Sequence, residues 1–154
     1  MGEAEFYKNK SNSTNTPRVE GAINSNPIPS MASQEPIMVK GFYAYSGYGN
    51  TPATKEQVNR AKPIINMGIP AFGKNRQFEF EGRSYLITHS RGGGDQKRIS
   101  LYSDTRLLDE IVYTNGGYNG PYSSVRSSRA EALDDFRREM VRTITGIGLA
   151  NRRR

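Results

Sequence analysis

Few residues of this sequence could do acid–base or nucleophilic chemistry. His89 is the only histidine and cysteine is absent, which excludes thiolate catalysis, disulfides and cysteine-ligated metals. Ser90 follows His89 directly, but neighbouring residues of a strand point to opposite faces, so no Ser–His dyad is implied. A lone histidine beside a predicted hairpin is typical of a surface or half-buried polar residue rather than a catalyst. We therefore predict no catalytic nucleophile among these residues.

Two carboxylate pairs, Asp109–Glu110 and Asp134–Asp135, could serve as acid and base or as metal ligands. The second pair falls in the first two turns of a predicted helix, where acidic side chains complement the helix dipole. No group of His, Asp and Glu shows a recognisable metal-ligand spacing. We therefore expect no enzyme activity, metal or cofactor, and an enzyme with an unrecognised active site is the third alternative for the function.

The segment SRGGGDQKR (Ser90–Arg98) could be a phosphate-binding loop, an RNA-binding Arg-Gly segment or a hairpin loop. A phosphate-binding loop needs a helix after its glycines, whereas the β-favouring run ISLYS follows here. A single Arg-Gly-Gly is far short of a repeated RNA-binding segment. The pattern predicts a hairpin loop between strands near Arg83–His89 and Ile99–Ser103, with a basic tip suited to an acidic partner.

The segment KGFYAYSGYG (Lys40–Gly49) carries the strongest nucleic-acid signal. Its first three residues match the start of the RNA-recognition strand pattern, in which aromatic rings stack on bases. The match fails at Tyr43 and Ala44, and no βα unit precedes it. An ordinary aromatic strand is the favoured interpretation, and its tyrosines are suited to a protein interface.

The elements that position these residues follow from periodicity and turn signals. A strand is predicted from Ile37, then a short helix that starts at a capping box of Thr54 with Gln57 and stops at Pro63. An irregular apolar connection follows, whose large side chains must pack away from water: Ile64, Ile65, Met67, Ile69 and Phe72.

The second half of the chain contains a further hairpin and the clearest helix. Glu81-Gly82 predicts a tight turn between strands. The segment from Ser103 to Asn115 is either a short helix or, as we favour, a turn leading into a strand. A helix then begins at Ser128, and either Gly146 or Gly148 ends it. Its apolar stripe either covers its own sheet or enters a partner's groove: Leu133, Phe136, Met140, Ile144 and Ile147.

Composition sets the domain organisation. Residues 1–36 are rich in Asn, Ser, Thr and Pro and predict an arm that is disordered until it binds along a partner. Residues 37–115 predict a small α+β domain, 116–127 a Gly/Tyr/Ser linker, and 128–154 an amphipathic helix with a basic tail. The chain lacks an apolar run of membrane-spanning length and a secretory signal, so we expect a soluble, intracellular protein.

The predicted fold is α+β: a mostly antiparallel sheet, a short helix, a C-terminal amphipathic helix and an extended N-terminal arm. This plan is similar to linker and adaptor proteins of large assemblies, such as phycobilisome linkers or phage virion connectors. The similarity is one of composition and transfers no residue roles. It implies association with a particle.

The net charge of +7 indicates an acidic partner. We predict a non-catalytic basic linker or adaptor that binds acidic protein subunits of a multisubunit complex, and a nucleic-acid-binding module is the alternative. The predicted partner-binding residues are Phe42, Tyr43, Tyr45, Tyr48, Arg91, Lys97, Arg98, Arg137, Arg138, Arg142, Arg152, Arg153 and Arg154.

Overall fold

The computed structural model describes residues 35–47, 49–115 and 124–151. From Pro36 onward the chain belongs to one compact unit, with two helices, a three-stranded sheet and a four-stranded sheet, all strands antiparallel in the described residues. The predicted α+β class is confirmed. Three predicted features lie outside the described residues: the arm up to residue 34, linker residues 116–123, and the partner-binding residues Tyr48, Arg152, Arg153 and Arg154.

The larger sheet is a meander in which each strand pairs with the next along the chain. Its strands are β4 (Asn75–Phe80), β5 (Arg83–Arg91), β6 (Lys97–Ser103) and β7 (Arg106–Tyr113). Glu81 and Gly82 both have positive φ angles, of 51° and 80°, as a two-residue type I′ hairpin requires. The predicted tight turn is confirmed. A second two-residue turn precedes β7, so the strand interpretation of this segment is confirmed and the helix alternative is wrong.

The glycine-rich segment joins β5 to β6 as a hairpin, as predicted, and a strand rather than a helix follows it. The loop is shorter than predicted because Ser90 pairs with Arg98 and Arg91 pairs with Lys97. The unpaired loop is residues 92–96, and it is closed by a 2.8 Å hydrogen bond from Gly92 N to Gln96 O. Arg91 and Lys97 therefore belong to strands, not to the loop tip.

The smaller sheet has the order β2-β3-β8, with β2 (Met38–Val39), β3 (Phe42–Ser46) and β8 (Ile147–Asn151). The prediction of one continuous strand from Ile37 is wrong. Lys40 and Gly41 have φ angles of 52° and 82°, so the chain reverses there and Met38 pairs with Tyr43. Gly41 permits this turn because it has no Cβ to clash at positive φ.

Strand β8 was not predicted, because Ile147 continues the apolar spacing of the helix before it. Gly146 ends that helix in the left-handed conformation, with φ of 80°, as one of the two predicted glycines. The following residues are extended, and Leu149 pairs with Ala44 of β3. Ile147 and Leu149 are both buried. The alternation of Ile147 and Leu149 is too short to distinguish a strand from a continuation of the apolar stripe of the helix.

Helix α1 (Lys55–Ile65) begins at the predicted capping box. Gln57 N donates to Thr54 Oγ1 at 3.1 Å, and Thr54 N donates to Gln57 Oε1 at 2.8 Å. The prediction that Pro63 stops this helix is wrong, because the helix continues to Ile65. Pro63 removes one donor to the carbonyl of Asn59, and both residues are exposed, so that carbonyl is accessible to water.

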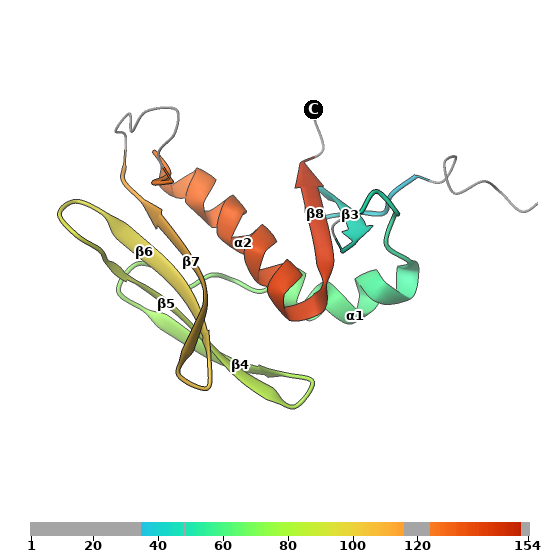
Figure 1. The fold of residues 1–154 in the computed structure, drawn as a ribbon, viewed down its shortest axis with the longest axis horizontal. Helices are drawn as coiled ribbons and strands as arrows, with labels where there is room; N and C mark the ends of the chain where they lie inside the picture. The colour runs from blue at the N-terminus through green and yellow to red at the C-terminus, as the bar shows by residue number, and fades with distance from the viewer. Residues whose placement is uncertain (1–34, 48, 116–123, 152–154) are drawn as a thin grey trace, which may run out of the picture. The chain divides into compact units, whose positions relative to one another are not determined.

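Helix α2 (Arg129–Thr145) contacts β7, β8 and α1 (Figure 1). Ser128 caps it by accepting a 3.2 Å hydrogen bond from Glu131 N. Phe136 and Met140 are fully buried, whereas Leu133 and Ile144 are half-buried against the core. Of the two interpretations of the apolar stripe, the structure shows the one in which the helix covers its own domain.

Candidate functional site

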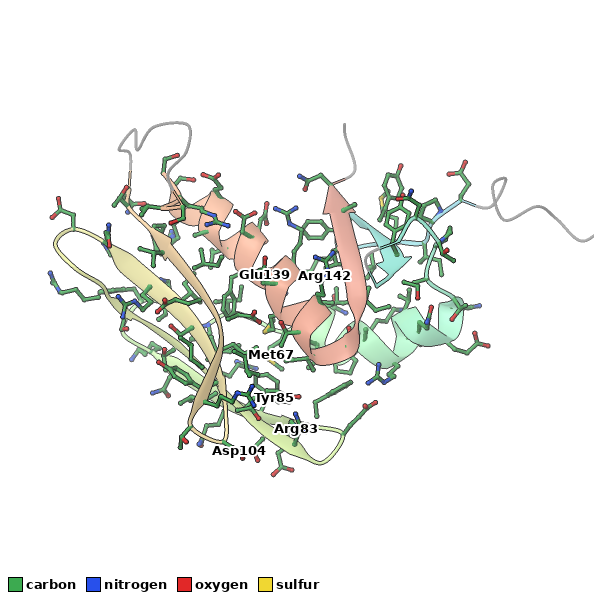
Figure 2. All side chains as sticks on the ribbon, in the orientation of Figure 1. Met67, Arg83, Tyr85, Asp104, Glu139 and Arg142 are labelled. Atoms are coloured by element: carbon green, nitrogen blue, oxygen red, sulfur yellow. The ribbon has the colours of Figure 1, made fainter. Side chains whose placement is uncertain are left out.

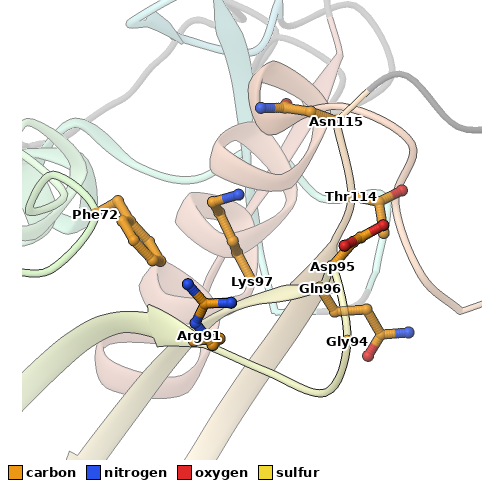
Figure 3. A pocket seen from close by; sticks show the side chains of 8 residues that line it. All are labelled: Phe72, Arg91, Gly94, Asp95, Gln96, Lys97, Thr114 and Asn115. Atoms are coloured by element: carbon orange, nitrogen blue, oxygen red, sulfur yellow. The ribbon is translucent and has the colours of Figure 1, made fainter.

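A cleft of about 560 Å³ opens beside the glycine hairpin of the four-stranded sheet. It lies where β5 ends and β6 begins, next to the end of β7. Figure 3 shows its lining residues: Phe72, Arg91, Gly94, Asp95, Gln96, Lys97, Thr114 and Asn115. The cleft combines charged, aromatic and amide side chains, as binding sites commonly do.

Two cations stand directly across from each other in this cleft. Arg91 is the register partner of Lys97 on the neighbouring strand, and like charges in this position repel and destabilise a sheet. Neither makes a salt bridge within the residues that the structure describes. The structure thus brings together two of the predicted partner-binding residues and leaves their charges without a counter-ion in the described chain.

Phe72 forms an aromatic wall of the cleft. The prediction that it packs away from water is wrong, because 42% of the residue is exposed. The Nζ atom of Lys97 lies 5.2 Å from the centre of its ring, within the range of a cation–π interaction. The other apolar residues of the connection do pack on the core: Ile64 and Ile65 are buried, and Met67 and Ile69 are partly buried.

His89 supports this wall from the protein interior. Its ring is perpendicular to that of Phe72, with the centroids 5.7 Å apart. Its Nδ1 lies 2.9 Å from Pro70 O and its Nε2 lies 2.7 Å from the Tyr113 hydroxyl. A carbonyl only accepts, so Nδ1–H donates to Pro70 and Nε2 accepts from Tyr113. Burial raises the pKa of Tyr113, which keeps this donor protonated.

The hydrogen bonds of His89 explain its position and its role. It is buried, with 2% exposure, rather than at or near the surface as expected, because both ring nitrogens have partners. Ser90 is exposed while His89 is buried, so the two residues face opposite sides and form no dyad. The histidine acts here as a structural support for the aromatic wall.

Arg98 does not join the two cations of the cleft. It follows Lys97 on a strand and therefore points to the opposite face of the sheet. There its Nε lies 3.0 Å from Glu110 Oε2 in a salt bridge. The basic tip predicted from Arg91, Lys97 and Arg98 is thus divided between two faces.

Three arginines of α2 were predicted to bind a partner, and the structure shows that each of them interacts with other residues of the chain. Arg137 is half-buried and its Nη1 donates to the carbonyls of Ile65 and Met67, so it satisfies carbonyls at the end of α1. Burial lowers the pKa of Arg137. The sequence offered no signal for this contact between distant segments.

The other two helix arginines are also engaged. Arg138 forms a salt bridge with Asp135, whose other oxygen accepts from Arg126 Nε at 2.7 Å. Arg142 lies beside β8 (Figure 2), where a Cβ atom added to Gly148 would come within 2.9 Å of its Nη2. Their role in binding a partner stays a prediction, but each already has a structural contact.

The aromatic residues of β3 are divided between the core and the surface. Phe42 is 6% exposed and belongs to the core, together with Ala44. Tyr43 and Tyr45 alternate with them and are half-buried. A buried Phe42 cannot stack on a base, which leaves the ordinary aromatic strand as the interpretation that the structure supports.

The pKa of Asp109 is raised, chiefly by burial, and a hydrogen bond from Thr143 partly opposes this shift. It is half-buried on β7 and does not line the cleft. In the part of the chain that is described, no three His, Asp or Glu residues gather closely enough to hold a metal ion. Neither described helix is long and apolar enough to cross a membrane.

No protein-family model matches this chain, and no curated protein or solved structure matches it either.

Proposed function

We propose that this protein is a non-catalytic basic adaptor that binds acidic proteins, with Arg91 and Lys97 as its central contact. The observation that carries the proposal is the direct apposition of these two cations without a counter-ion in the described chain. An anionic group entering the cleft would relieve their repulsion. The net charge of +7 would attract such a partner at longer range.

An acidic protein fits this cleft better than a nucleic acid does. Proteins that bind nucleic acids without sequence preference present a continuous cationic groove along the phosphate backbone. Here Asp95 lines the same cleft as the two cations, and Arg98 is paired on the opposite face. Such a mixture of charges suits a partner that presents separate acidic groups. We extend the proposal to a subunit of a multisubunit particle on the basis of composition.

The test is binding to poly-glutamate at about 50 mM and about 500 mM salt, where screening differs strongly. The double variant Arg91→Gln with Lys97→Gln should bind about tenfold more weakly at low salt, which corresponds to about 1.4 kcal/mol. The matched control is Arg83→Gln with Arg106→Gln. It removes the same charge from two exposed arginines outside the cleft and should reduce binding much less.

Two results would contradict the proposal. Equal losses in the two double variants would show that net charge, not the cleft, governs binding. A double-stranded DNA oligonucleotide that binds more tightly than poly-glutamate at the same salt, and depends on Arg91 and Lys97, would assign the site to nucleic acid instead.

A further inference from the structure

The cleft contains more than an anion-binding group. We infer that it recognises an acidic residue that is flanked by an aromatic or aliphatic residue on the partner protein. This inference rests on the proposed function and specifies the chemistry of the partner segment. Three groups of side chains in the cleft support it.

The first observation is the order of these groups. In Figure 3, Phe72 lies on one side, Asp95, Thr114 and Asn115 lie on the other, and the side chains of Arg91 and Lys97 lie between them. A ligand whose carboxylate reaches the two cations therefore has an apolar surface on one side and polar groups on the other.

The second observation is the exposed ring of Phe72. Its exposure of 42% places it among the three exposed large apolar residues of the described chain. One contact of the ring is with Lys97 and another is with His89, which is itself fixed by two hydrogen bonds. A rigid, partly exposed ring loses little entropy when an apolar side chain covers it. Covering about half of the exposed area of the ring should raise the affinity about fivefold.

The third observation concerns the charge of the bound group. Asp95 lines the wall beside the cations, and its carboxylate would repel a phosphate, which carries up to two negative charges, more than a singly charged carboxylate. Asp95 can accept hydrogen bonds from peptide N–H groups, and the Asn115 amide can both donate and accept. These groups suit a peptide segment with a side-chain carboxylate.

The experiment compares two peptides of equal charge, Ac-EEEFEEE-NH2 and Ac-EEEAEEE-NH2, by fluorescence anisotropy of labelled forms. The wild-type protein should bind the phenylalanine peptide about fivefold more tightly. Phe72→Ala should abolish this preference while still binding the alanine peptide, and Phe72→Leu should keep part of it. The matched control is Leu107→Ala, which removes another exposed apolar side chain, one outside the cleft, and should keep the full preference.

The outcomes separate this inference from the proposed function. Equal binding of both peptides by the wild type, or a preference that survives Phe72→Ala, would overturn the inference and leave the adaptor proposal intact. Failure of both peptides and of poly-glutamate to bind at low salt would overturn both. A peptide with phosphoserine in the central position that binds more tightly than the phenylalanine peptide would show that the cleft prefers phosphate, and the inference would be wrong.

Discussion

The substitution Arg137→Met tests whether this arginine holds α1 to α2 or faces a partner. Methionine retains much of the apolar stem of the side chain but removes every donor. The carbonyls of Ile65 and Met67 would then lose the Nη1 donor. Ile65 is the last residue of α1, so its carbonyl has no partner within the helix.

The expected cost follows from these two bonds. A hydrogen bond from a charged group contributes about 1.5–3 kcal/mol. Both bonds use one nitrogen of a half-buried side chain, and water can reach part of the site, so we expect a total of about 2–3 kcal/mol. The midpoint of thermal unfolding should fall by roughly 10 °C for a domain of this size.

The measurement is urea unfolding followed by circular dichroism, with the denaturant slope as a check on two-state behaviour. Arg129→Met is the control, because Arg129 is an exposed arginine on the same helix, and it should change the free energy of unfolding by less than about 0.5 kcal/mol. An unchanged free energy for Arg137→Met, together with weaker binding of poly-glutamate, would refute the capping role and restore the predicted partner contact.

Two further predictions concern a half-buried carboxylate and a tight backbone contact. Burial raises the pKa of Asp109, so its contribution to stability is complete below the pKa of an unfolded aspartate and is lost as the pH rises through the folded value. Asp109→Asn should therefore raise the melting temperature at pH 7. The melting temperature of the variant should also decrease less between pH 4 and pH 7 than that of the wild type. A Cβ at Gly148 would lie 2.6 Å from Gly47 O, so Gly148→Ala should cost about 1–3 kcal/mol in urea unfolding.

For each of these two predictions, one result would contradict it. A melting temperature of Asp109→Asn that lies below the wild type at pH 7 would show that the charged carboxylate is favourable in the fold. Gly93→Ala is the control for Gly148→Ala, because a Cβ at Gly93 meets nothing within 4 Å. If the two alanine variants are equally stable, the backbone near Gly47 moves at little cost.

Local signals in the sequence predicted the parts of the fold that local chemistry determines. The capping box at Thr54, the turn at Glu81-Gly82 and the cap at Ser128 each depend on residues within a few positions of one another. The prediction that Pro63 ends the helix was wrong because the effect of a proline depends on whether the carbonyl that loses its donor, here that of Asn59, can reach water. The exposure of Asn59, which decides this, is a property of the packed domain.

The cleft was partly predictable. The hairpin interpretation placed Arg91 and Lys97 near each other, and strand alternation places Lys97 and Arg98 on opposite faces, which contradicts the prediction of a single basic tip. Phe72 could not be predicted, because it lies in an irregular segment and its position depends on a contact with His89. The internal contact of Arg137 could not be predicted for the same reason, since its acceptors are about seventy residues away.

The pairing of β3 with β8 has a consequence for how the chain acquires its structure during synthesis. Ser46 pairs with Ile147, roughly a hundred residues later, whereas each strand of the meander pairs with its neighbour in sequence. Contacts between distant segments form late because closing a long loop costs entropy. Strand β8 can therefore pair beside Phe42 only after almost the whole domain has left the ribosome, so β3 should complete its backbone hydrogen bonds late in synthesis.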